Sequence, residues 1–200
     1  MWRRGLTGLA VAAGMVGGDA SAGVLGGHAS AASVECLWNA LPSSVRQHVT
    51  TAGTISSVVE AMERWRPPDA KLTALARQCG VTADESGQPG KIASFAVGGK
   101  IIDAWALSRF ADTGQITQTD LTRAWDLVTP DARKAIARHF REAVASTFPQ
   151  LTKAPGPIDI ETVRSLMQAL KPADQQTAIE IYFYFYGRAV LEDLAAQSAD

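Results

Sequence analysis

The sequence lacks the short residue patterns by which several common enzyme classes are recognised. It contains no His-Glu-x-x-His, Cys-x-x-Cys or Gly-x-Ser-x-Gly, and its 200 residues include only three histidines and two cysteines. These patterns supply the metal ligands, redox thiols and activated serine of zinc hydrolases, thiol oxidoreductases and serine hydrolases. We therefore predict no catalytic residues, no metal site and no cofactor.

An excess of charge of either sign is also missing. The chain has 19 Lys and Arg residues against 20 Asp and Glu residues, which gives a formal net charge of -1. A nucleic-acid binder normally carries a basic surface that neutralises phosphates. The composition thus predicts no nucleic-acid partner. Hydrophobic residues make up 46% and charged residues 20%, which is enough apolar material for the core of one domain.

The N-terminal segment has the layout of a secretory signal peptide. Arg3 and Arg4 precede an apolar run, and Ala20-Ser21-Ala22 forms a small-x-small cleavage site, so residues 1–22 are predicted to be removed. The run is shorter than the roughly 20 apolar residues that span a bilayer. A second Ala-Ser-Ala at 29–31 leaves open whether cleavage follows Ala22 or Ala31. An uncleaved anchor or an ordinary N-terminal helix is the alternative.

Export to the periplasm or the medium changes the interpretation of the two cysteines. In an oxidising compartment, Cys36 and Cys79 are predicted to form a disulfide. Two buried free thiols are one alternative. A zinc site that adds His48 and His139 is another, although these spacings match no known zinc pattern. No later segment is long and apolar enough to span a membrane after signal cleavage.

Residues 23–33 are mostly glycine, alanine and serine, which predicts a flexible lead-in. Residues 34–200 are predicted to form a single all-α domain, an orthogonal or irregular bundle of about eight or nine short helices. Its corners are marked by four Gly-x-Ile sequences, where a left-handed glycine can end a helix, and by prolines that can start one. The predicted helices are 34–40, 42–51, 55–65, 68–79, 88–111, 118–128, 130–147, 158–170 and 172–196.

One corner, at 110–121, resembles the second half of an EF-hand calcium loop. The alignment on Gly114 puts Arg109, Ala111 and Thr113 where the first three side-chain ligands should be. Calcium requires several carboxylate or carbonyl oxygens. We therefore interpret this segment as a corner between two helices, in which Thr117 caps the second helix.

The aromatic segment IYFYFYG at 181–187 alternates as a strand would, but its flanks are strong helix formers. No second alternating run offers a partner strand, so we predict a helix buried on most faces. Its main apolar stripe is expected to run from Ile179 to Leu194, with Tyr184 and Arg188 on another face.

Two hypotheses for function follow. The first is an exported, non-enzymatic helical protein that binds a protein partner or a small apolar ligand, with Tyr184 and Arg188 as the contact residues. The alternative is a hydrolase-like enzyme of a helical family that uses a carboxylate, such as Glu60 or Asp103, in a cleft between helices.

Overall fold

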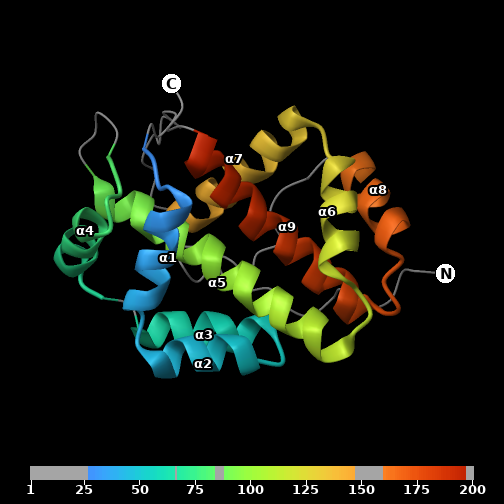
Figure 1. The fold of residues 1–200 in the computed structure, drawn as a ribbon, viewed down its shortest axis with the longest axis horizontal. Helices are drawn as coiled ribbons and strands as arrows, with labels where there is room; N and C mark the ends of the chain where they lie inside the picture. Colours follow the sequence, from blue (N-terminus) through green and yellow to red (C-terminus); the bar gives the residue numbers. More distant parts are fainter. Residues whose placement is uncertain (1–26, 66, 84–87, 147–159, 197–200) are drawn as a thin grey trace.

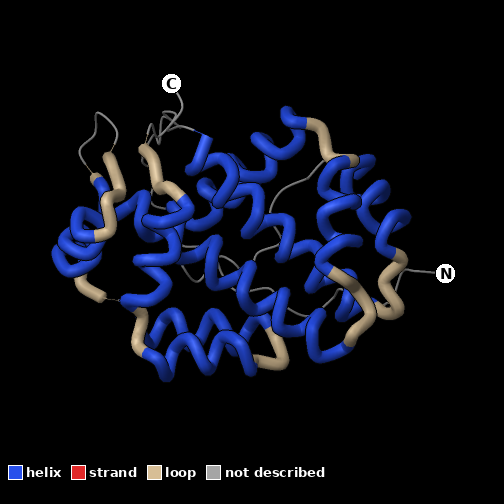
Figure 2. Tube along the Cα trace, in the orientation of Figure 1, coloured by secondary structure: helices blue, strands red, loops and turns tan. Residues whose placement is uncertain are grey.

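A computed structural model describes residues 27–65, 67–83, 88–146 and 160–196. This part of the chain contains nine α-helices and no β-strand, which confirms the predicted all-α bundle (Figures 1 and 2). The predicted signal peptide, residues 1–22, lies outside the described residues.

Every helix begins and ends within three residues of its predicted bounds. The helices are α1 (Ala31–Ala40), α2 (Ser43–Thr51), α3 (Ile55–Trp65), α4 (Asp69–Gln78), α5 (Pro89–Thr113), α6 (Gln118–Asp126), α7 (Pro130–Ser146), α8 (Ile160–Leu170) and α9 (Gln175–Ala196). Among them, none is long and apolar enough to cross a membrane.

The two longest helices, α5 and α9, lie side by side through the centre of the bundle (Figure 1). Helices α1 to α4 pack against α5, whereas α7 packs against α9. The aromatic segment is part of α9, so its predicted helical state is confirmed. Its expected apolar stripe is corrected at one end, because Ile179 is 36% exposed and Ile181 is fully buried.

Helices α5 and α9 meet backbone to backbone at a pair of glycines. A Cβ atom built on Gly187 would lie 2.7 Å from the carbonyl oxygen of Gly99 and 3.1 Å from the backbone nitrogen of Asp103. A Cβ atom on Gly99 would lie 3.2 Å from the carbonyl oxygen of Gly187. Only residues without a side chain permit this approach.

The corner between α5 and α6 is built as predicted. Gly114 ends α5 in the left-handed conformation, with φ of 63°. The Thr117 hydroxyl accepts the Asp120 N–H and the Asp120 carboxylate accepts the Thr117 N–H, which forms a capping box. Gly53 and Gly90 do not take the expected left-handed conformation, and Gly90 lies within α5. The fourth Gly-x-Ile corner lies outside the described residues.

The lead-in expected to be flexible at 23–33 is ordered where the structure describes it. The backbones of His28 and Thr82 exchange hydrogen bonds of 3.2 and 3.0 Å. The His28 ring and the Ala29 N–H both donate to the carbonyl oxygen of Leu194, and Ala29 is fully buried. Partners more than fifty residues away in sequence thus hold this segment, which its own composition does not reveal.

Helix α1 begins at Ala31, three residues before the predicted start. The cause is Ser30, whose hydroxyl accepts the N–H of Ser33 and caps the helix.

A disulfide joins Cys36 of α1 to Cys79 at the end of α4, with Cα atoms 5.5 Å apart, which confirms the predicted bridge. Neither sulfur is therefore a free thiol or a zinc ligand. The bridge spans a sequence separation of 43 residues. In the chain-entropy description, closing such a loop stabilises the folded state by about 4 kcal/mol.

We expect Gly187→Ala to destabilise the protein, because the new Cβ would clash with the backbone of α5. Overpacking costs about 1–3 kcal/mol, which outweighs the gain of at most about 1 kcal/mol from the higher helix propensity of alanine. Urea unfolding measures the difference. Gly53→Ala is the control, because no atom lies within 4 Å of its added Cβ. Equal stability of the two variants would contradict the close crossing.

A candidate ligand pocket between three helices

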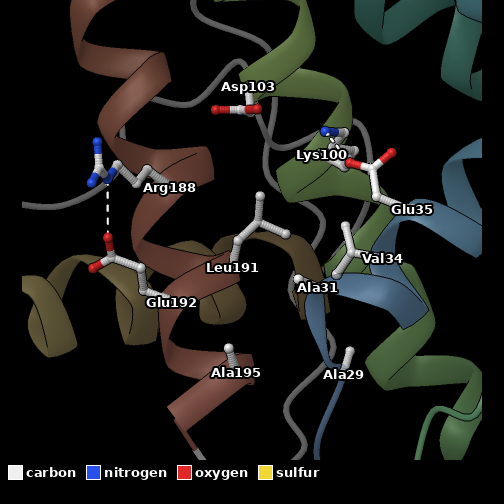
Figure 3. A pocket seen from close by; sticks show the side chains of 10 residues that line it. All are labelled: Ala29, Ala31, Val34, Glu35, Lys100, Asp103, Arg188, Leu191, Glu192 and Ala195. Atoms are coloured by element: carbon white, nitrogen blue, oxygen red, sulfur yellow. Dashed lines mark hydrogen bonds and ion pairs between the residues drawn. The ribbon is translucent and has the colours of Figure 1, made fainter. Parts of the chain in front are cut away.

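A cavity of about 320 Å³ lies between the start of the described chain, α1, α5 and α9 (Figure 3). This volume is at the lower end of the range of about 300–1,000 Å³ found for small-molecule sites. The lining residues are Ala29, Ala31, Val34, Glu35, Lys100, Asp103, Arg188, Leu191, Glu192 and Ala195.

One part of the pocket wall is aliphatic. Ala29, Ala31 and Val34 come from the N-terminal segment and α1, whereas Leu191 and Ala195 come from α9. In Figure 3, Ala29 and Ala195 lie at the end of the pocket opposite to Asp103. This surface suits an apolar ligand, because contact with aliphatic side chains removes apolar area from water.

Two ion pairs flank the other part of the wall. Lys100 Nζ lies 2.6 Å from a carboxylate oxygen of Glu35, which joins α5 to α1. Arg188 Nε donates to the Glu192 carboxylate at 3.0 Å, one turn along α9. Each cation in the wall therefore already has an anionic partner.

Asp103 lines the pocket and, in Figure 3, lies between Arg188 of α9 and Lys100 of α5. Within the described part of the chain, its carboxylate makes no hydrogen bond or salt bridge. Burial raises the pKa of Asp103 above its ordinary value of 3.8, and the negative charge of Glu35 raises it further. The positive charges of Lys100 and Arg188 lower the pKa but do not offset the burial. Asp103 is thus an acceptor without a direct partner.

The glycine crossing explains why the Asp103 carboxylate is partly buried. Asp103 follows Gly99 by one turn of α5, and its backbone nitrogen would lie 3.1 Å from a Cβ on Gly187. Because α9 approaches α5 so closely, it covers the side of α5 from which Asp103 projects. The fold therefore partly desolvates this carboxylate, and the residue stays partly exposed at the pocket.

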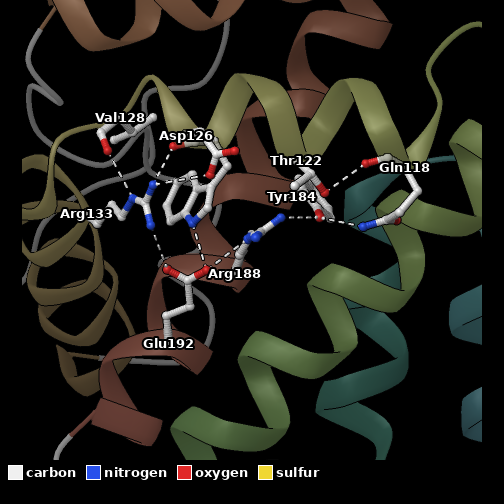
Figure 4. Close-up of polar contacts among 9 residues, drawn as sticks. Gln118, Thr122, Asp126, Val128, Arg133, Tyr184, Arg188 and Glu192 are labelled. Atoms are coloured by element: carbon white, nitrogen blue, oxygen red, sulfur yellow. Dashed lines mark hydrogen bonds and ion pairs between the residues drawn. The ribbon is translucent and has the colours of Figure 1, made fainter.

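A polar network fixes the α9 side of the pocket (Figure 4). The Glu192 carboxylate accepts the Trp125 indole N–H at 2.7 Å and lies 3.6 Å from the Arg133 guanidinium. Arg188 also donates to the Tyr184 hydroxyl at 3.2 Å. The two guanidiniums lie over the Trp125 ring, at 4.7 Å for Arg133 and 5.4 Å for Arg188. These contacts hold Arg188 and Glu192 in place.

The structure brings together the two predicted contact residues, but they play different parts. Arg188 lines the pocket. Tyr184 was expected outside the apolar stripe, yet its side chain is in the core with 2% exposure and packs edge-on against Phe110 of α5. The physical reason is that α9 is central and is covered on this side too. Tyr184 can act on a ligand only by positioning Arg188.

The two carboxylates that the enzyme hypothesis names, Glu60 and Asp103, lie in different environments. Glu60 lies on the surface of α3, with a side chain that is 66% exposed and paired with Arg64 at 3.5 Å, so its predicted place in a cleft is wrong. Asp103 does line a pocket between helices. Among the described residues, no three His, Cys, Asp or Glu side chains are placed to hold a metal ion.

Sequence reasoning missed Glu35, Lys100 and Glu192 as pocket residues. The spacing of four residues between Arg188 and Glu192 is a signal for a helical ion pair that could have been used. Glu35 and Lys100 are 65 positions apart in sequence and lie on different helices, so no local sequence pattern indicates their contact.

We expect Asp103→Asn to stabilise the protein at neutral pH. A carboxyl with a raised folded-state pKa loses stability as the pH rises from below 3.8 through that pKa, and the neutral amide does not. Thermal unfolding from about pH 3 to 7 should therefore show similar stability at the acid end and a more stable variant at neutral pH. A variant less stable than wild type at neutral pH would show that attraction to Lys100 and Arg188 dominates instead.

Comparisons with protein-family models, with curated proteins and with solved structures find no match to this chain. The geometry of the pocket is therefore the basis for the functional proposal.

Proposed function

We propose that this is an exported, non-enzymatic helical protein that binds a small, largely apolar ligand in the pocket between α1, α5 and α9. The observation that carries the proposal is the pocket wall itself. Five aliphatic side chains provide the contact surface, and both cations of the wall are already neutralised by carboxylates. A pocket of this kind can bind and orient a molecule without reacting with it.

A small ligand is favoured over a protein partner by the outer surface. Among the described residues, only two large hydrophobic side chains are exposed, Leu127 at 59% and Ile179 at 36%. The core of a stable protein interface normally contains several apolar and aromatic side chains. The described surface offers no such cluster.

Enzymatic activity is the second candidate, because a buried carboxylate with a raised pKa in a pocket can serve as a general acid or base. Against it, the lining contains no Ser, Thr, Cys, His or Tyr, and the other groups that could act as a nucleophile or base, Glu35, Lys100 and Glu192, are held in ion pairs. Binding and catalysis can be distinguished by recovering the bound molecule after incubation with the protein. A binding protein returns it unchanged, whereas an enzyme returns a product.

Export is supported by the sequence of residues 1–22, and the Cys36–Cys79 disulfide is compatible with it. We place the cleavage after Ala22. A cut after Ala31 would remove His28 and the fully buried Ala29, with the hydrogen bonds that both make to Leu194. It would also remove part of the pocket wall.

A large side chain introduced into the pocket should exclude the ligand. Ala31 and Ala32 are adjacent exposed residues of α1, but only Ala31 lines the pocket. We expect untargeted mass spectrometry to detect a small molecule that copurifies with the exported wild-type protein and with Ala32→Trp. Ala31→Trp should carry it at a tenth of that level or less, on the order of a loss of 1.4 kcal/mol in binding. Equal loading of the two tryptophan variants would contradict the proposed site.

N-terminal sequencing of the exported protein tests the processing. The mature chain should begin at Gly23. A first residue of Ala32 would show that the Ala29 contacts are dispensable, and a first residue of Met1 would show that no signal peptide is removed.

A further inference from the structure

We infer that the ligand carries a positively charged head group, an aliphatic ammonium, which donates its N–H groups to Asp103. This inference rests on the proposed function, because it names the chemistry of the molecule that the same pocket binds. Three independent features of the wall lead to it: its charge balance, the state of Asp103, and the separation of its charged and aliphatic parts.

The charge balance favours a monovalent cation. Two cations, Lys100 and Arg188, and three carboxylates line the pocket, so the ionised wall carries one net negative charge. Because Glu35 and Glu192 already pair with the two cations, an anionic ligand would add a further negative charge to a wall that has no unpaired cation among its described residues. A cationic ligand neutralises the wall and breaks no existing pair.

The partly buried carboxylate of Asp103 differs in its hydrogen bonds from the fully buried carboxylate of Glu180. Glu180 is 1% exposed, and its carboxylate accepts hydrogen bonds from Arg109 at 3.0 Å and Gln176 at 3.1 Å. Asp103 has no such donor among the described residues, although burial raises its pKa. Among the described residues no donor compensates for the partial desolvation of this carboxylate, and a ligand ammonium would supply a charge-assisted hydrogen bond.

The layout of the wall fits a molecule with two unlike ends. Figure 3 shows Asp103 at one end of the pocket and Ala29 and Ala195 at the other, with Leu191 between them. A head group bound at Asp103 would therefore direct its hydrocarbon chain along Leu191 towards the alanines. This arrangement requires a single-chain amphipathic amine.

Three probes of equal chain length test the head group, namely octylammonium, octanol and octanoate, with binding measured by calorimetry near pH 7. Octylammonium should bind the wild-type protein at least about tenfold more tightly than octanol, since hydrogen bonds to a charged group are the stronger kind. Octanoate should bind more weakly than octanol. Ala31→Trp should abolish the binding of octylammonium and octanol.

Asp103→Asn should reduce the preference of octylammonium over octanol to within about threefold, because its amide carries no charge. Asp112→Asn is the matched control on the same helix. Asp112 is exposed and lies outside the pocket, so this variant should keep the wild-type preference. If Asp103→Asn does not fold, the order of the three probes on the wild-type protein still decides.

The outcomes separate the two proposals. If none of the three probes binds, or if Ala31→Trp binds them all, the pocket is not a site for small apolar ligands and the proposed function fails. If octanol or octanoate binds as tightly as octylammonium, or if Asp103→Asn keeps the full preference, the pocket stands and the cationic head group is wrong.

Discussion

The backbone contact between Gly99 and Gly187 is the constraint on which the structure depends. It sets the distance between α5 and α9, the two helices that connect the halves of the bundle. Because no Cβ atom separates them at the crossing, α5 and α9 pack closely and cover each other's facing surfaces. In the aromatic segment of α9, Tyr184, Phe185 and Tyr186 are buried, and Trp125 of α6 stacks on Phe185 with ring centroids 5.2 Å apart. The close crossing also leaves Asp103, one turn away, only partly exposed to solvent.

The packing also brings charged side chains of different helices close together, where they form ion pairs. Arg109 of α5 meets Glu180 of α9, and Lys100 of α5 meets Glu35 of α1. Arg133 of α7 reaches Glu192 of α9. The Glu35 and Glu192 pairs are partly exposed and add little net stability, whereas loss of Arg109 would leave the buried Glu180 carboxylate without its cation, which is strongly unfavourable. These pairs connect α1, α5, α7 and α9, whereas the Asp103 carboxylate makes no such pair among the described residues.

Much of the architecture could be predicted because its signals are local. The Gly114 corner, the Thr117 cap and the helix formers around the aromatic segment each act within a few residues. The pocket could not be predicted, since its wall combines residues from the N-terminal segment, α1, α5 and α9. Tyr184 shows the same limit. Its angle around α9 follows from its position in the chain, but whether that side is covered depends on Phe110 and on the path of α5.

The N-terminal wall explains how the pocket can be ready before a ligand arrives. Ala29, Ala31 and Val34 would form a poor surface on a mobile segment, because ordering them would reduce the affinity. Two features order them in the free protein: the hydrogen bonds of His28 to Thr82 and Leu194, and the disulfide that ties α1 to α4. On the opposite wall, Glu192 and Trp125 hold Arg188. Both walls of the pocket are therefore held by contacts within the protein itself, so a bound molecule would not have to order them.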